Sequence, residues 1–147
     1  MKQLVTAVLV SMLFGVGTLA AGDAVTGTWK TVDDKTGKIM SEVELYEQGG
    51  KLFGKITGLT EANDKQGKPQ TDKANKNASL RNRPIIGLPI FEGWREAGAN
   101  KWKGPVYDPE DGQNYDVDIT LAGDKLTLKG CIAFLCDSDT WNRYRAP

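Results

Sequence analysis

The chain has 147 residues, with 19 basic side chains, 19 acidic side chains and no histidine. Balanced charge argues against broad electrostatic capture of nucleic acid or of an anionic membrane surface. The lack of histidine excludes serine–histidine and cysteine–histidine nucleophilic sites and removes the commonest zinc ligand. The sequence predicts no metal site, no cofactor site and no nucleic-acid partner.

The first twenty residues have the pattern of a secretory signal peptide. Lys2 gives a positive start, residues 4–16 are mostly apolar, and small residues lead up to Ala20. We predict cleavage after Ala20, with Ala24 as the alternative, and hence export to the periplasm. The apolar run is shorter than the roughly 20 residues that span a bilayer, so we predict no membrane span after cleavage. Residues 21–147 are then long enough for one domain.

Alternation of apolar and polar residues with a period of two dominates residues 21–147. It is clearest from Tyr115 to Leu121, and Gly123-Asp124 then gives a strong hairpin turn. Similar turns, rich in Asp, Gly and Pro, recur at short spacing with few helix starts. In chain order, the predicted strands are residues 26–32, 39–47, 51–58, 85–92, 101–107, 113–121, 124–131 and 139–145.

These eight segments predict an all-β fold, a single antiparallel up-and-down β-barrel over residues 21–147. Closure is favoured because it removes exposed sheet edges; a two-sheet sandwich is the alternative. Pro89 cannot donate to a ladder, so we expect it at an edge or a bulge. The polar segment 60–83 is the one long loop. We expect a solvated excursion there, with a lid or partner-binding loop as the alternative.

Cys131 and Cys136 are predicted to form a disulfide in an oxidising compartment. Five residues of extended chain would hold their Cα atoms roughly 16 Å apart, whereas a disulfide needs about 5.5 Å. The chain must therefore turn within residues 132–135, which we expect to be a loop between the last two strands. A redox pair matches the spacing less well, and a zinc site would need further ligands.

Carboxylates remain as possible catalytic groups. Asp108, Glu110 and Asp111 cluster around a Pro/Gly turn and do not have the spacing of a calcium loop. A hairpin turn accounts for them. A catalytic carboxylate pair needs a cleft with a perturbed environment, which no pattern here supplies. We therefore predict no catalytic residues and a protein that is not an enzyme.

The aromatic residues indicate either a filled core or a ligand cavity. We expect Arg143 to stack on Trp29 and so join the first and last strands at the barrel closure. The candidate ligand cavity consists of Trp102, Tyr115, Trp141 and Arg143. Core packing of the same rings is the alternative, although the strand glycines would leave space inside. These glycines are Gly54, Gly87, Gly104 and Gly130.

Several motifs resemble a known family over nearly all of residues 21–147. The motifs are Gly27-Thr28-Trp29-Lys30-Thr31, Asp34-Lys35-Thr36-Gly37-Lys38, residues 50–56, residues 107–112, and Gly130-Cys131 through Trp141-Asn142-Arg143. The Gly-x-Trp start with a late arginine resembles the lipocalin and calycin eight-stranded barrels. The full set is similar to the domain of unknown function 2147 family, an exported bacterial family. The lipocalin resemblance implies small apolar ligands, although fold alone does not determine function.

Two functions follow as expectations. The first is a periplasmic, non-catalytic barrel that binds a small apolar or amphipathic molecule. The second is a structural or protein-interaction module of the cell envelope with a filled barrel, which would contact an envelope protein through residues 60–83 or 84–91. A continuous cavity would favour the first, and a packed interior beside an exposed apolar patch would favour the second.

Overall fold

The computed structural model describes residues 24–33 and 35–147, so the predicted signal peptide lies outside the described residues. Within those two ranges, no helix is both long and apolar enough to cross a membrane. The described chain contains eight strands and one short 3₁₀ helix, η1 (Ala78–Leu80). The strands are β1 (Gly27–Val32), β2 (Ile39–Gln48), β3 (Lys51–Leu59), β4 (Pro89–Trp94), β5 (Lys101–Asp108), β6 (Gln113–Ala122), β7 (Lys125–Ile132) and β8 (Leu135–Arg143).

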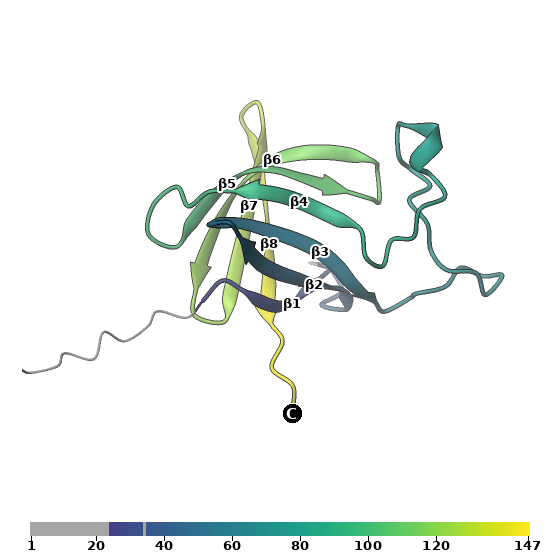
Figure 1. The fold of residues 1–147 in the computed structure, drawn as a ribbon, viewed down its shortest axis with the longest axis horizontal. Helices are drawn as coiled ribbons and strands as arrows, with labels where there is room; N and C mark the ends of the chain where they lie inside the picture. The colour runs from purple at the N-terminus through teal and green to yellow at the C-terminus, as the bar shows by residue number, and fades with distance from the viewer. Residues whose placement is uncertain (1–23, 34) are drawn as a thin grey trace, which may run out of the picture.

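The strands form one antiparallel sheet that curls into a nearly closed barrel (Figure 1). Their order is β4-β3-β2-β1-β8-β7-β6-β5, so consecutive strands are neighbours and the last strand returns to the first. β1 pairs with β8 through Trp29 opposite Arg143 and Lys30 opposite Asn142. β4 and β5 stand at the two ends of this order, and an isolated bridge joins Glu96, which follows β4, to Trp102 of β5. The predicted up-and-down barrel of eight strands is confirmed.

Because neighbouring strands are antiparallel, the connections alternate between two ends of the barrel. The loop end, as we name it, carries four connections: residues 33–38, 60–88, 109–112 and 133–134. The closure end carries the other three, residues 49–50, 95–100 and 123–124, together with the residues that precede β1.

Two predicted strand positions were wrong. The fourth strand starts at Pro89 rather than residue 85, because residues 85–88 form a turn that hydrogen-bonds to Ile56 of β3. The last strand spans Leu135–Arg143 rather than 139–145, because the β7–β8 ladder continues past the cysteines to Ile132 opposite Leu135. Pro89 lies on β4, beside irregular pairing with β3, as its missing N–H requires.

Large apolar side chains fill the barrel. The buried cluster includes Trp29, Trp94, Trp102, Trp141, Phe91 and aliphatic residues from the strands and from segment 85–88. At two strand glycines, an aromatic ring takes the place of a side chain. A Cβ at Gly54 would lie 2.6 Å from the Phe91 ring, and one at Gly104 would lie 2.7 Å from the Trp94 indole. Core rings therefore occupy the space beside these two glycines, as expected if the aromatic residues pack the core rather than line a ligand cavity.

Candidate functional site

The long loop between β3 and β4 holds a buried polar cluster rather than a purely solvated excursion. Asp72 is completely buried and Asn75 nearly so. The Asp72 carboxylate accepts hydrogen bonds from the Tyr107 hydroxyl at 2.6 Å and from Asn75 Nδ2 at 2.8 Å. Arg83 donates through Nε at 2.8 Å and forms an ion pair through Nη2 at 2.8 Å. Every oxygen of this buried carboxylate is thus bonded, as burial of a charge requires.

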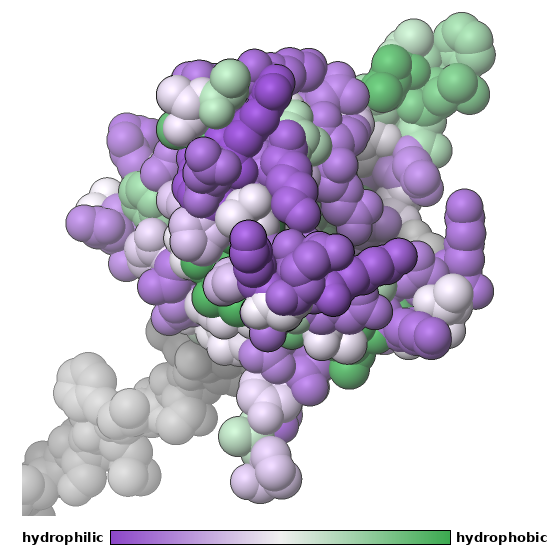
Figure 2. Space-filling model, turned by 90° about the vertical axis from the view of Figure 1, so that its right-hand side faces the viewer, coloured by the Kyte–Doolittle hydropathy of each residue, from purple (hydrophilic) through white to green (hydrophobic). Residues whose placement is uncertain are grey.

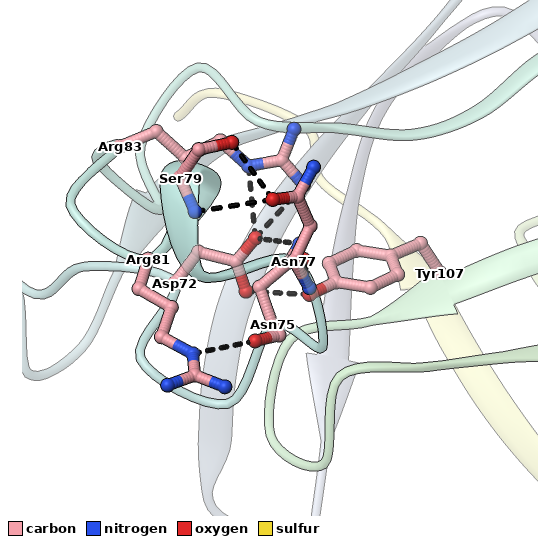
Figure 3. Close-up of polar contacts among 7 residues, drawn as sticks. All are labelled: Asp72, Asn75, Asn77, Ser79, Arg81, Arg83 and Tyr107. Carbon is pink, nitrogen blue, oxygen red and sulfur yellow. Dashed lines mark hydrogen bonds and ion pairs between the residues drawn. The ribbon is translucent and has the colours of Figure 1, made fainter.

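The cluster joins two parts of the chain that lie far apart in the sequence (Figure 3). Tyr107 comes from β5, and its ring also faces the Arg83 guanidinium at 5.5 Å. On the loop side, Arg81 Nε donates to the Asn75 carbonyl at 2.7 Å. Asn77 caps η1 by accepting from the Ser79 amide. These contacts hold the loop against the barrel wall.

The loop also packs directly on the β5–β6 turn at Gly112. This glycine has a φ of +70°, and a Cβ there would lie 2.0 Å from the Ala74 carbonyl oxygen. No side chain fits so close a backbone approach. Lys76 Nζ adds a hydrogen bond of 3.4 Å to Gln113 at the start of β6. The loop and this turn therefore form one continuous surface.

Opposing effects set the ionisation of this cluster. Burial acts to raise the pKa of Asp72, but hydrogen bonds from Tyr107, Asn75 and Arg83 outweigh it and lower the pKa below its ordinary value of 3.8. Burial and the Asp72 carboxylate together raise the pKa of Tyr107 above 10.0. Asp72 is therefore a carboxylate and Tyr107 a neutral donor at neutral pH.

The predicted hairpin turn at Asp108–Gly112 is confirmed. Asp108 and Asp111 accept hydrogen bonds from the amides of Glu110 and Gln113, and the Tyr115 hydroxyl donates to Asp111. Burial raises the pKa of Asp108, whereas the Tyr115 hydroxyl lowers the pKa of Asp111. Among the described residues, no group of three or more Cys, Asp or Glu side chains is arranged to hold a metal ion.

A groove of about 420 Å³ lies beside the Asp72 cluster. Its wall combines the loop, the edge strands β4 and β5, and the β5–β6 turn. The lining residues are Asn75, Lys76, Asn77, Arg83, Pro89, Glu92, Tyr107, Gly112 and Asn114. The surface is polar and of mixed charge. It offers carboxamides, a guanidinium, an ammonium and a carboxylate to a small molecule.

The predicted cavity residues do not gather around this groove. Arg143, Trp141 and Trp102 lie toward the closure end, since they pair with Trp29, Leu126 and Ile119 respectively. Tyr115 lies at the opposite end of β6, next to the loop-end turn. Trp102 lines a second, smaller pocket of about 330 Å³ with Ala97, Lys101, Lys103, Asp118, Ile119 and Thr120. The structure therefore does not bring these four residues into one pocket.

At the closure end, Arg143 lies over Trp29, as expected from the sequence. The guanidinium carbon is 4.4 Å from the ring centroid. Its nitrogens also donate to the carbonyls of Ala24 and Thr26 at 2.7 and 3.1 Å, and its Nε pairs with Asp124 at 3.0 Å. The Trp29 indole N–H donates to the Val25 carbonyl at 2.9 Å. Arg143 thus links the start of β1, the end of β8 and the β6–β7 turn.

The predicted disulfide between Cys131 and Cys136 is confirmed. The two residues face each other across the β7–β8 ladder, with Cα atoms 4.0 Å apart. The chain turns between them as predicted, but the turn itself is shorter than the expected loop of 132–135. It consists of Ala133 and Phe134, because Ile132 and Leu135 still pair. Ala133 adopts a left-handed φ of 55° there.

In the sequence, the length of the loop is the sole sign of the Asp72 cluster. Asp72 and Arg83 lie within a mixed charge run, which usually indicates a solvated surface. Tyr107 lies 35 positions after Asp72, so no local pattern couples the two. The length of the loop, well above about 15 residues, was the available signal, since loops of that length tend to be functional.

Fold and core together define a lipocalin-like barrel. A solved structure with 24% sequence identity, protein HP1028 from Helicobacter pylori, is described as belonging to the lipocalin family. It matches with a TM-score of 0.70 over 83% of this chain and 84% of that chain. A comparison with curated proteins found no match.

The family model described as "Uncharacterized protein conserved in bacteria (DUF2147)" matches residues 27–143. The chain therefore belongs to the DUF2147 family, as its motifs suggested. The match begins at the first residue of β1 and ends at the last residue of β8, so it covers the whole barrel.

Proposed function

We propose that this protein is an exported, non-catalytic barrel that binds a small amphipathic molecule at its loop end. Eight-stranded barrels of this size either fill their interior or hold one small ligand. Here aromatic rings take up space inside, and the groove beside Asp72 offers polar groups outside. The observation that carries the proposal is this groove of about 420 Å³, within the range of small-molecule sites.

The groove suits a ligand whose head both donates and accepts hydrogen bonds. Arg83 and Lys76 supply positive charge, and Glu92 supplies negative charge. Arg83 is oriented in advance because two of its nitrogens bind the buried Asp72. Such fixed donors cost little entropy when a ligand binds. Pro89 and the Tyr107 ring give an apolar surface for the rest of the molecule.

Native mass spectrometry of protein purified from periplasm tests this proposal. We expect a reproducible bound small molecule in the natural protein and its loss in Asn114→Trp, because a large ring would fill the groove. Asp116→Trp is the matched control. It lies two residues further along the same exposed face of β6 and does not line the groove. Protein that carries no small molecule, or equal occupancy in Asn114→Trp, would refute the proposal.

A filled interior favours a second candidate, an interaction module of the cell envelope. The aromatic rings at Gly54 and Gly104 support it, as do the exposed apolar side chains of Leu80 and Ile86 in the long loop. In that case, protein from periplasm would be empty of small molecules and would co-purify with one specific envelope protein. If variants of the loop end lost this partner, and the natural protein carried no small molecule, the interaction module would become the preferred function.

Export through a cleaved signal peptide is part of the proposal. A disulfide and a bacterial family are both compatible with it. The contact between Arg143 and the Ala24 carbonyl argues for cleavage after Ala20, since cleavage after Ala24 would remove that acceptor. We expect the intact mass of the mature protein to correspond to residues 21–147. A mass for residues 25–147 would contradict this cleavage site.

A further inference from the structure

The tip of the β7–β8 hairpin exposes large apolar side chains to solvent. Ile132, Phe134 and Leu135 are 68%, 90% and 71% exposed. Figure 2 shows a hydrophobic projection standing out from a mostly hydrophilic face, at the height of the hairpin tip in Figure 1. Exposed single apolar residues are ordinary, but three within four positions at one tip are not.

The hairpin projects beyond the sheet that supports its base. β7 pairs with β6 from Lys125 to Gly130, and the described β8–β1 pairing comprises Asn142 and Arg143. The last residues before the turn are therefore held mainly by the other strand of the hairpin. An isolated two-stranded hairpin is marginally stable in water. The Cys131–Cys136 disulfide lies directly behind the tip and holds its shape.

We propose that this tip, residues 132–135, inserts into the interfacial region of a lipid bilayer. Three side chains on a convex tip offer a few hundred Å² at most, whereas a stable protein interface buries roughly 800 Å² on each partner. A bilayer needs no matching pocket, because lipids rearrange around an inserted apolar group. Insertion of a tip is compatible with the lack of a membrane-spanning helix in the described residues.

Charges near the tip indicate that the attraction is apolar rather than electrostatic. Next to the tip, the hairpin strands carry Lys129 against Asp137 and Asp139, and the other two basic residues of these strands, Lys125 and Arg143, lie at the far end of the hairpin. Insertion should then persist at high salt, unlike binding through a basic patch.

Other exposed apolar side chains lie toward the same end of the barrel. They are Ile39 and Met40 at the start of β2, and Leu80 and Ile86 in the long loop. Tyr144, by contrast, follows β8 at the closure end. Insertion of the hairpin would therefore turn the loop end toward the membrane. The inference stands on the tip and does not depend on a ligand in the groove.

Vesicle co-sedimentation tests the proposal directly. The full mature protein is mixed with vesicles of phosphatidylcholine alone and with vesicles of phosphatidylethanolamine and phosphatidylglycerol. We expect binding to both, and a loss of roughly tenfold or more in the triple variant Ile132→Ser, Phe134→Ser and Leu135→Ser. Tyr144→Ser, which removes an exposed ring at the closure end, should bind as the natural protein does. The triple variant keeps both cysteines, and its thermal unfolding checks that the barrel is intact.

A second variant reports on the depth of insertion. Phe134→Trp places an indole at the tip, where brominated lipids should quench its fluorescence, while Trp29, Trp94, Trp102 and Trp141 are buried in the core. The proposal is overturned if the natural protein does not sediment with either vesicle, or if the triple variant binds equally well. Binding only to the vesicles that contain phosphatidylglycerol, and its loss at high salt, would assign the contact to basic residues instead. A dimer that the triple variant loses, without vesicle binding, would assign the tip to a second copy of the chain.

Discussion

Arg143 closes the barrel through several contacts made by one side chain. Its guanidinium covers the Trp29 ring, donates to three backbone carbonyls and pairs with Asp124, while its side chain is only 11% exposed. Arg145 also pairs with Asp124 but is 66% exposed. The two arginines therefore share a partner and differ in burial.

We predict that Arg143→Ala lowers the free energy of unfolding by about 2 kcal/mol, because it removes the charge-assisted hydrogen bonds of a largely buried guanidinium. Arg145→Ala, the matched control, should change it by less than about 0.5 kcal/mol, as expected for an exposed ion pair. Urea unfolding followed by tryptophan fluorescence measures both. Equal stability of Arg143→Ala and the natural protein would rule out a closure role.

Asp72 couples the stability of the loop to pH. Its pKa is lower in the folded chain than the ordinary 3.8, so its ionisation stabilises the fold above that value. This contribution is lost as the pH falls through the lower, folded-state pKa. We predict that Asp72→Asn costs roughly 3 kcal/mol at neutral pH, because Arg83 loses its buried partner.

Thermal unfolding between pH 2 and neutrality should show a weaker acid dependence in Asp72→Asn than in the natural protein. Asp118→Asn is the control, since Asp118 is 60% exposed and pairs with the exposed Lys103. It should keep the natural acid profile. If Asp72→Asn unfolded with the same pH dependence as the natural protein, ionisation of Asp72 would not be what makes the stability depend on acid pH.

At the scale of elements, the contact between the long loop and the β5–β6 turn depends on the absence of a side chain at Gly112. We predict that Gly112→Ala displaces the loop, because its Cβ would collide with the Ala74 carbonyl. Gly50→Ala is a matched control, with a φ of +72° against +70° and no atom within 4 Å of the added Cβ. Both variants bear the cost of a left-handed alanine, about 1 kcal/mol.

Limited trypsin digestion separates the two glycine variants. Lys73, Lys76 and Arg81 lie in the docked part of the loop, so Gly112→Ala should be cut there much faster than Gly50→Ala. Equal cleavage rates would show that the loop does not depend on this close approach.

The tip of the β7–β8 hairpin extends past the neighbouring strands, so we expect it to open independently of the barrel. We predict that replacing Cys131 and Cys136 by serine costs at most roughly 2 kcal/mol, since the closed loop is short. Hydrogen exchange should accelerate mainly at residues 131–136 and little in β1–β6. Uniformly faster exchange throughout the barrel would contradict an element that opens by itself.

At the scale of the whole molecule, alternation and turns were enough to predict the barrel and nearly all of its strands. The Cys131–Cys136 spacing required a turn, and the Trp29 and Arg143 pair indicated how the ends meet. Strand limits at Pro89 and Leu135 were missed, because they depend on hydrogen bonds to Ile56 and on a ladder that continues through the disulfide. Sequence periodicity contains neither kind of information.

The candidate site was harder to predict than the fold. Its central residue, Asp72, is buried by a tertiary contact with Tyr107, whereas its local sequence is polar and charged. Similarly, Phe91 takes the space beside Gly54 through the pairing of β3 with β4, and Trp94 takes the space beside Gly104 of the other edge strand. Whether side chains fill the interior of a barrel or leave a cavity depends on such contacts. The filled interior could therefore be recognised only from the structure.

We propose that ligands bind at the loop end while the interior of the barrel is packed with side chains. Backbone amide chemical-shift mapping, with the isotope-labelled protein titrated with small molecules extracted from the periplasm, tests this most directly. We predict shifts concentrated at residues 75–77, 83, 92, 107 and 112–114, with Trp29, Trp102 and Trp141 unchanged. Shifts centred on these core tryptophans would place the ligand inside the barrel, and no shifts at all would contradict binding.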